Sequence, residues 1–291
     1  MSKDTLIWPS VCHHIGAKTT AMSLLKDHVK TAIKEKWQTV LLGDIINNGV
    51  STGSKHVGLE WGDCMDPMDQ VELAIDTFMP LAKAGLLKGI FGGNHAIRTV
   101  KAAGLHPEKV IAMYLTLATT GKKPKNIMAG LVQQMHELSD LEAQGFSGGH
   151  ATARYAKARD KIIDQIKTHQ PGPEFEWSVP FFPGAGIMEI NGISIACHHG
   201  IHAKTRDNWA RLENSMKGHR MYFTGHNHRL DWQREKETIR GIKYVADYYS
   251  CGTYQGYEQY AQVAGYASKE QGSLLVTYDH DKDKARHIVL D

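Results

Sequence analysis

The sequence predicts an α/β layered domain. Through the first hundred of its 291 residues, short apolar runs alternate with amphipathic helical segments. Several of these apolar runs end in glycine followed by Asp, Asn or His, which is typical of buried strands that lead into polar loops. Two hairpin signals follow in the last third of the chain. We therefore expect a single domain over residues 1–291, with a helical insertion at about 99–170.

Five segments of the first hundred residues alternate between strand and helix. An apolar run opens residues 4–16, and apolar residues at helical spacing follow in residues 21–36. Residues 37–49, WQTVLLGDIINNG, read as a buried strand that ends in a loop. A helix with a glycine stop is expected at 71–85, and another strand with polar residues after it at 86–98.

The remaining elements are a helical stretch and then hairpins. Residues 107–145 and 151–169 are helical in pattern and form the expected insertion. Asn191-Gly192 lies between two alternating apolar runs, which is a strong hairpin signal. A helix at about 208–216 and a short strand at 221–224 come next, and residues 272–291 read as a second hairpin.

Composition indicates a globular protein and excludes several classes. Hydrophobic residues make up 42% of the chain and charged residues 22%, as in ordinary globular domains. The formal net charge of +3 is too small to indicate nucleic-acid binding by itself. No apolar run approaches the roughly 18 residues that span a bilayer. With no signal-peptide pattern at the start and four scattered cysteines, we expect a cytoplasmic protein with reduced thiols.

Five predicted strand ends carry Asp, Asn, His or Cys next to glycine. In α/β sheets, binding sites form outside the carboxyl ends of the strands, where loops far apart in sequence converge. One such loop is weak evidence, and a pair such as His226 and His228 alone could be two ordinary polar loop residues. Five in one chain indicate a shared polar site. The segments are CHHIG at 12–16, GD at 43–44, GNH at 93–95, HHG at 198–200 and GHNH at 225–228.

The residue types in these loops favour two transition-metal ions. Asp44 offers two oxygens and can bridge two cations, Asn94 offers a carbonyl oxygen, and the histidines offer nitrogen. Mixed nitrogen and oxygen ligands suit Zn, Fe, Mn or Ni better than Ca or Mg. About eight donors exceed the four that one tetrahedral ion needs. Two ions about 3.5–4 Å apart would use them and would bind a phosphate group. His95, beside Asn94, is then placed to protonate a leaving oxygen.

The motif series GD, GNH, HG and GHxH, in this order over about residues 6–230, resembles the calcineurin-like metallophosphoesterase superfamily. The chain is similar to phage-type and bacterial members of unassigned substrate. This resemblance implies a four-layer α/β/β/α sandwich with a dinuclear site, and it makes His95 the general acid. It implies a first metal at Cys12, His14, Asp44 and His228, and a second at Asp44, Asn94, His199 and His226.

The sequence departs from this family at three positions. Cys12 stands where Asp is usual, so either a thiolate binds the first metal or Cys12 is a small buried residue that touches no metal. Ala96 follows GNH where Glu or Asp is common, and Asn47 stands where some branches carry an Asp that orients the acid histidine. Neither carboxylate is therefore available to hold His95.

Several neighbouring residues have a functional and a structural interpretation. His13 and His198 are expected to point away from the site, because adjacent side chains of an extended strand face opposite sides. His202 and Arg206, together with Asn94, are candidate substrate-binding residues. A solvated loop position is the simpler interpretation of His202, and exposure is the default for Arg206.

The expected activity is hydrolysis of a phosphoester, with phosphodiesters of nucleotides or nucleic acid favoured. Two features support a diester: the basic stretches at 121–126 and 154–161, and six tyrosines between 248 and 266. Both have a structural interpretation, as a solvated helix face and as core-edge packing. The alternatives are a protein or small-molecule phosphomonoesterase, or a metal-retaining binding module without activity.

Overall fold

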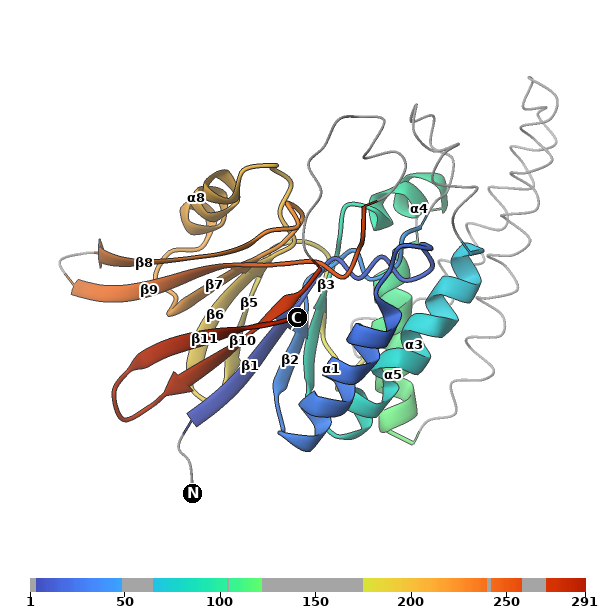
Figure 1. Ribbon diagram of the computed structural model, residues 1–291, viewed down its shortest axis with the longest axis horizontal. Coiled ribbons are helices and arrows are strands. Elements are labelled where there is room, and N and C mark those ends of the chain that lie inside the picture. Colours follow the sequence, from blue (N-terminus) through green and yellow to red (C-terminus); the bar gives the residue numbers. More distant parts are fainter. Residues whose placement is uncertain (1–3, 49–64, 104, 122–174, 240–241, 258–270) are drawn as a thin grey trace.

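Two β-sheets stack face to face at the centre of the fold, and helices cover their outer faces (Figure 1). The mixed α/β class predicted from the sequence is therefore confirmed. The computed structural model describes residues 4–48, 65–103, 105–121, 175–239, 242–257 and 271–291.

The first sheet carries six strands among the described residues, in the order β11-β10-β1-β2-β3-β4. Strands β1 to β4 run parallel to one another. Strand β10 is antiparallel to β1, and β11 is antiparallel to β10. The carboxyl ends of β1, β2 and β3 therefore share one edge of the sheet. The strands are β1 (Asp4–Ser10), β2 (Gln38–Leu41), β3 (Leu87–Phe91), β4 (Phe181–Phe182), β10 (Ser273–Asp279) and β11 (Lys284–Leu290).

The second sheet carries five strands among the described residues, in the order β5-β6-β7-β9-β8. Its three inner strands, β6, β7 and β9, are parallel, and the two edge strands are antiparallel to their neighbours. The carboxyl ends of β6 and β7 therefore also lie together. The strands are β5 (Gly186–Ile190), β6 (Ile193–His198), β7 (Met221–Thr224), β8 (Leu230–Ile239) and β9 (Ile242–Cys251).

The helices complete a four-layer α/β/β/α sandwich, as the family resemblance implied. Three helices, α1, α3 and α5, pack on the outer face of the first sheet, and α8 packs on the outer face of the second (Figure 1). Helix α4 begins one residue after His95. The helices are α1 (Met22–Lys34), α3 (Pro67–Lys83), α4 (Ala96–Ala103), α5 (Pro107–Thr119) and α8 (Thr205–Ser215).

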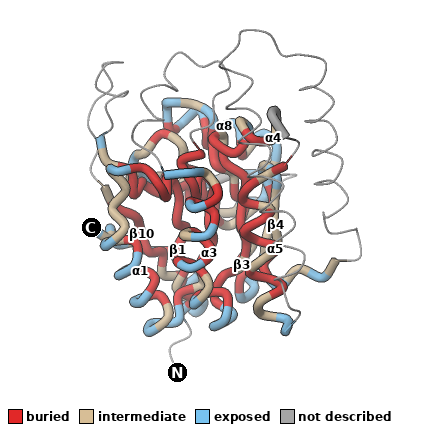
Figure 2. The backbone as a smooth tube through the Cα atoms, turned by 90° about the vertical axis from the view of Figure 1, so that its right-hand side faces the viewer, coloured by how far each residue is buried: buried red, intermediate tan, exposed pale blue. Residues whose placement is uncertain are grey.

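The apolar runs of the central strands are continuous because both of their faces are buried. In β1, Ile7 packs in the core between the sheets, and its neighbour Trp8 packs under the helices. The same alternation places Phe91 between the sheets and Ile90 on the helical side. Most of β1 and β3 is accordingly buried (Figure 2). Such runs are typical of a parallel sheet covered on both faces.

Local signals account for several element boundaries. Asp66 caps α3 by accepting a hydrogen bond from the backbone N–H of Met68 at 2.8 Å, and Pro67 occupies the first helical turn. Asn191 and Gly192 have φ values of 50° and 79°, as the predicted tight turn between β5 and β6 requires. Helix α3 consequently begins four residues before the expected position 71.

Two parts of the fold differ from the sequence expectations or extend them. Helix α5 falls inside the range expected as an insertion, but it packs beside α3 on the first sheet and belongs to the core. Residues 122–170 of that range lie outside the described residues. The hairpin of β8 and β9, with strands of ten residues each, was not predicted, because β8 is rich in charged residues. None of the described helices is both long and apolar enough to cross a membrane.

An ion-pair network centred on a buried aspartate joins the two sheets. Asp247 on β9 is fully buried and accepts hydrogen bonds from Arg220 and from Arg234, the latter at 2.7 Å. Arg220 also donates to Asp283 at 3.1 Å, in the turn between β10 and β11. Because Arg220 directly precedes β7, this network connects the second sheet to the edge hairpin of the first.

Candidate metal centre at the carboxyl ends of the strands

The five loops singled out in the sequence meet at the shared edge of the two sheets. Loops after β1, β2 and β3 approach from the first sheet, and loops after β6 and β7 approach from the second. Cross-sheet contacts hold them together, since the backbone N–H of His226 donates to the Cys12 thiol at 3.3 Å. The side chains that meet there are Cys12, His14, Asp44, Asn94, His95, His199, His226 and His228.

One set of donors forms a chain of close contacts across the two sheets. His199 Nε2 lies 2.9 Å from Asp44 Oδ2 and 2.8 Å from Asn94 Oδ1. His226 Nδ1 lies 2.9 Å from the same Asn94 oxygen. Four side chains thus direct nitrogen and oxygen atoms at one another. They are the four that the family resemblance assigns to the second metal.

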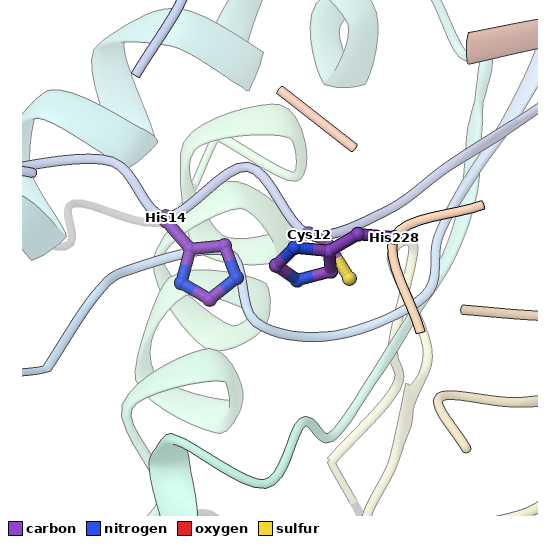
Figure 3. Close-up of side chains that lie close together, drawn as sticks. All are labelled: Cys12, His14 and His228. Carbon is purple, nitrogen blue, oxygen red and sulfur yellow. The ribbon is translucent and has the colours of Figure 1, made fainter. Parts of the chain in front are cut away.

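A second set lies near the first and shares a neighbour with it, because the candidate ligand atoms of Cys12, Asp44 and His199 also fall within 4.8 Å of one another. The candidate ligand atoms of Cys12, His14 and His228 all fall within 4.8 Å of one another, and Figure 3 shows their side chains grouped together. His14 Nε2 is 4.0 Å from Asp44 Oδ2, the oxygen that also contacts His199. One carboxylate oxygen is therefore near a histidine of each donor set.

Backbone and amide oxygens hold the histidine rings in place. His199 Nδ1 donates to the backbone carbonyl of Leu42 at 2.7 Å, and His14 Nδ1 donates to Asn47 Oδ1 at 3.2 Å. Each ring therefore presents Nε2 to the cluster. His14 Nε2 is buried and has no hydrogen-bond partner among the described residues. An unpaired nitrogen enclosed by donor atoms fits a metal ion, because a buried polar atom is otherwise costly to leave unpaired.

Asn47 also orients His95 through its backbone carbonyl, while its side chain contacts His14. His95 Nδ1 donates to the backbone carbonyl of Asn47 at 2.6 Å. The backbone N–H of His95 donates to Asp44 Oδ1 at 2.9 Å, and Asn48 Nδ2 donates to the His95 carbonyl at 2.8 Å. A main-chain oxygen thus supplies the contact that no carboxylate at position 47 or 96 can supply.

The electrostatics of the cluster are those of a carboxylate among buried imidazoles. Burial alone raises the pKa of Asp44, but the nearby charges of His199 and His95 outweigh it and hold the pKa well below its ordinary value. Burial lowers the pKa of His199, and the Asp44 carboxylate more than reverses this, so the net shift is upward. Burial, followed by the charge of His95, lowers the pKa of His14 well below its ordinary value.

The proposed ligands adopt a rare backbone conformation. Cys12, His14 and Asp44 have φ values of 51°, 48° and 48°, and His226 and His228 have values of 67° and 55°. Residues other than glycine seldom occupy this left-handed region, which costs on the order of 1–3 kcal/mol each and recurs at functional sites. The loop after β1 is therefore not an extended strand, which was the premise used to place His13.

His13 and His198 nevertheless contact groups outside the cluster. The His13 ring is buried and stacks on Tyr254, with 5.4 Å between ring centroids, and its Nε2 lies 2.7 Å from Ser10 Oγ. Burial lowers the pKa of His13 to about 3, so this histidine is neutral. His198 Nδ1 accepts a hydrogen bond from the backbone N–H of Gly200 at 3.0 Å.

The candidate substrate-binding residues occupy different positions relative to the cluster. Asn94 lies within it, as described above. His202 is half-buried in the loop after β6, where its backbone N–H donates to Asn208 Oδ1 at 2.9 Å. Arg206 is exposed on the first turn of α8. Their part in substrate binding stays a prediction.

Two buried polar residues support the site and were not predicted. Asn227, between His226 and His228, donates to Thr205 Oγ1 at 2.7 Å and accepts from Ser250 Oγ at 2.8 Å. It thereby anchors the GHNH loop to α8 and β9. Glu108 of α5 accepts hydrogen bonds from backbone N–H groups of the loops after β2 and β3. Its position in an apparently ordinary helix left no sequence signal.

The tyrosine-rich tail packs largely as the structural interpretation expected. Tyr248, Tyr249 and Tyr254 are buried, and Tyr254 OH lies 2.6 Å from His28 Nδ1. These rings are not available to stack on bases. The tyrosines at 260 and 266, and the basic stretches at 122–126 and 154–161, lie outside the described residues.

Comparison with known proteins gives only distant similarity. No protein-family model and no curated protein matches the sequence. A solved archaeal phosphodiesterase aligns at 12% identity over 98% of this chain and 100% of its own, with a TM-score of 0.37. A Thermotoga maritima protein aligns at 12% identity over 98% of both chains, with a TM-score of 0.32. The zinc complex of Vps29 from Entamoeba histolytica aligns at 14% identity over 45% of this chain and 76% of its own, with a TM-score of 0.23. These scores are low, so we base the function of this chain on its own geometry.

The close approach of two loops predicts an effect of adding one methyl group. A Cβ at Gly93 would lie 2.1 Å from the backbone nitrogen of Asp44. Gly93→Ala should therefore push the two loops apart and lower the free energy of unfolding by about 1–3 kcal/mol, as overpacking does. Gly184→Ala is the matched control, since its Cβ would meet nothing within 4 Å. Urea denaturation of both variants measures the difference. Equal stability of the two would contradict the tight contact.

Proposed function

We propose that this protein is a dinuclear-metal phosphoester hydrolase. The observation that carries the proposal is the position of Asp44 Oδ2, which is 2.9 Å from His199 Nε2 of one donor set and 4.0 Å from His14 Nε2 of the other. A single oxygen shared in this way is suited to bridging two cations. The first ion would be held by Cys12, His14, Asp44 and His228, and the second by Asp44, Asn94, His199 and His226.

The donor types support transition metals. Imidazole nitrogens make up half of the ligands in each set and suit Zn, Mn, Fe or Ni, and the Cys12 thiol favours the softer ions of this group. When bound, such ions polarise the phosphoryl oxygen and lower the pKa of water, so that hydrolysis proceeds near neutral pH. The two sets contain one carboxylate and one thiol among neutral ligands, so an occupied site would retain positive charge for an anionic phosphoester.

His95 would deliver the proton that the leaving group needs. Its Nδ1–H is held by the Asn47 carbonyl, so the ring can release a proton from Nε2 without losing its orientation. Its backbone N–H contact with Asp44 ties the ring to the bridging carboxylate. Asn94, half-exposed beside it, would contact the phosphate as well as the second ion.

Phosphodiesters of nucleotides or nucleic acid are the substrate class we favour, ahead of phosphomonoesters. The support is the basic composition of the stretches at 121–126 and 154–161. Hydrolysis of bis-nitrophenyl phosphate but not of nitrophenyl phosphate is the expected result. The reverse preference would indicate a phosphomonoesterase. Metal uptake without hydrolysis of either would indicate a binding module.

Removing the bridging charge tests the dinuclear assignment. Asp44→Asn should reduce bound metal from two ions per chain to one or none and abolish phosphodiester hydrolysis, because the amide cannot bridge two cations. Elemental analysis of the purified variant and a nitrophenyl ester assay provide the measurements. Asp76→Asn, the same change at an exposed position of α3, is the control. Normal activity in Asp44→Asn would contradict the dinuclear assignment.

Esters with different leaving groups test whether His95 is a general acid or a metal ligand. His95→Ala should keep both metals and lose about 10²–10⁴-fold in rate on an alkyl phosphodiester, where positioned proton transfer matters. On a nitrophenyl ester the loss should be much smaller, since nitrophenolate leaves without a proton. His280→Ala, in the turn of the C-terminal hairpin, serves as the control. If His95→Ala instead loses metal, and its rate falls equally on both esters, then His95 is a ligand.

Three substitutions decide whether the Cys12 thiolate binds metal. If it does, Cys12→Ser and Cys12→Ala should both lose the first ion, and Cys12→Asp should restore it with a preference shifted toward Mn, because carboxylate is a harder ligand than thiolate. Metal content after equilibration with Zn or Mn gives the measurement. Unchanged content in all three variants would remove Cys12 from the site.

A further inference from the structure

Glu108 is a buried carboxylate directly behind the candidate metal centre. It lies in the first turn of α5 with 1% of its surface exposed, and α5 packs against α3 and β3. A carboxylate at such a position is costly to bury unless its oxygens are bonded. The amino end of a helix favours negative charge, which offsets part of that cost.

The two oxygens of Glu108 contact two different loops of the site. Oε1 accepts a hydrogen bond from the backbone N–H of Ile45 at 3.3 Å, and Oε2 accepts one from the backbone N–H of Gly93, also at 3.3 Å. His106 Nδ1 lies 3.1 Å from Oε2. The carboxylate thus links the ends of β2 and β3 through main-chain atoms.

The linked residues are the immediate neighbours of two proposed ligands. Ile45 follows Asp44, and Gly93 precedes Asn94. On the other side of the same loops, Asp44 Oδ1 accepts the backbone N–H of His95 at 2.9 Å. The two loops are therefore tied at two points, and the separation of Asp44 from Asn94 depends on both.

We propose that Glu108 is a positioning residue that sets the distance between Asp44 and Asn94 and so raises the affinity of the site for its metal ions. The inference rests on the metal centre of the proposed function. A carboxylate suits this role because both of its oxygens accept hydrogen bonds. A glutamine has the same shape, but its amide nitrogen would face one of the two N–H groups as a second donor.

The test compares metal affinity with stability. Glu108→Gln should bind Mn²⁺ about 10–100-fold more weakly than the wild-type chain, as loss of a residue supporting a metal ligand typically does. Val110→Ala is the control for a general loss of helix packing, because it changes a buried residue two positions further along α5. Mn²⁺ affinity is measured by isothermal titration calorimetry at a temperature where both variants are folded.

Hydrogen exchange gives a second readout that needs no metal. In the metal-free protein, peptides covering residues 42–48 and 92–95 should exchange faster in Glu108→Gln than in Val110→Ala, since only the first change releases those two N–H groups. Wild-type Mn²⁺ affinity in Glu108→Gln, or an equal loss in Val110→Ala, would overturn the positioning role and leave the proposed function standing. A wild-type chain that binds neither Mn²⁺ nor Zn²⁺ would overturn both.

Discussion

The carboxylate of Asp44 is the contact on which the arrangement of the site depends. One oxygen accepts the backbone N–H of His95, and the other lies against His199. Asp44 follows β2 of the first sheet and His199 follows β6 of the second, so a single side chain joins the polar edges of both sheets. The surrounding imidazoles hold its pKa low, and the negative charge in turn raises the pKa of His199. Without this charge, His199 Nε2 would keep only the Asn94 oxygen as a partner.

The loops at this edge are held in conformations that they would not adopt alone. Cys12, His14, Asp44, His226 and His228 all have positive φ, and glycines allow the backbones to meet at short range. Gly43 is one example, since a Cβ there would lie 2.7 Å from the backbone nitrogen of Gly93. The free energy that such strain costs is offset by the two apolar cores beneath, where parallel strands are buried on both faces. The buried cores of the layered fold therefore stabilise the strained loops that form the site.

Support for the site comes from residues that are not themselves proposed metal ligands. The Asn47 carbonyl orients His95, Asn227 anchors the GHNH loop, and Glu108 links the loops after β2 and β3. In each case the main chain or a buried polar group makes the contact. The Asn47 contact explains how the chain holds His95 without a carboxylate at position 47 or 96.

The sequence by itself determined the order of strands and helices around the site and the residues gathered there. Its signals were local: apolar runs, glycine stops, and polar residues directly after them. The β8–β9 hairpin was not predicted, because its first strand is rich in charged residues. This strand lies at a sheet edge, where packing constrains the pattern of apolar residues least. The sequence also predicted that His14 and not His13 faces the cluster, but only the tertiary structure gave the reason, because positive φ values at Cys12 and His14 break the alternation of an extended strand. Likewise, only folding shows what holds His95 and what Glu108 contacts, since main-chain carbonyl and N–H groups are present at nearly every position and carry no sequence signature.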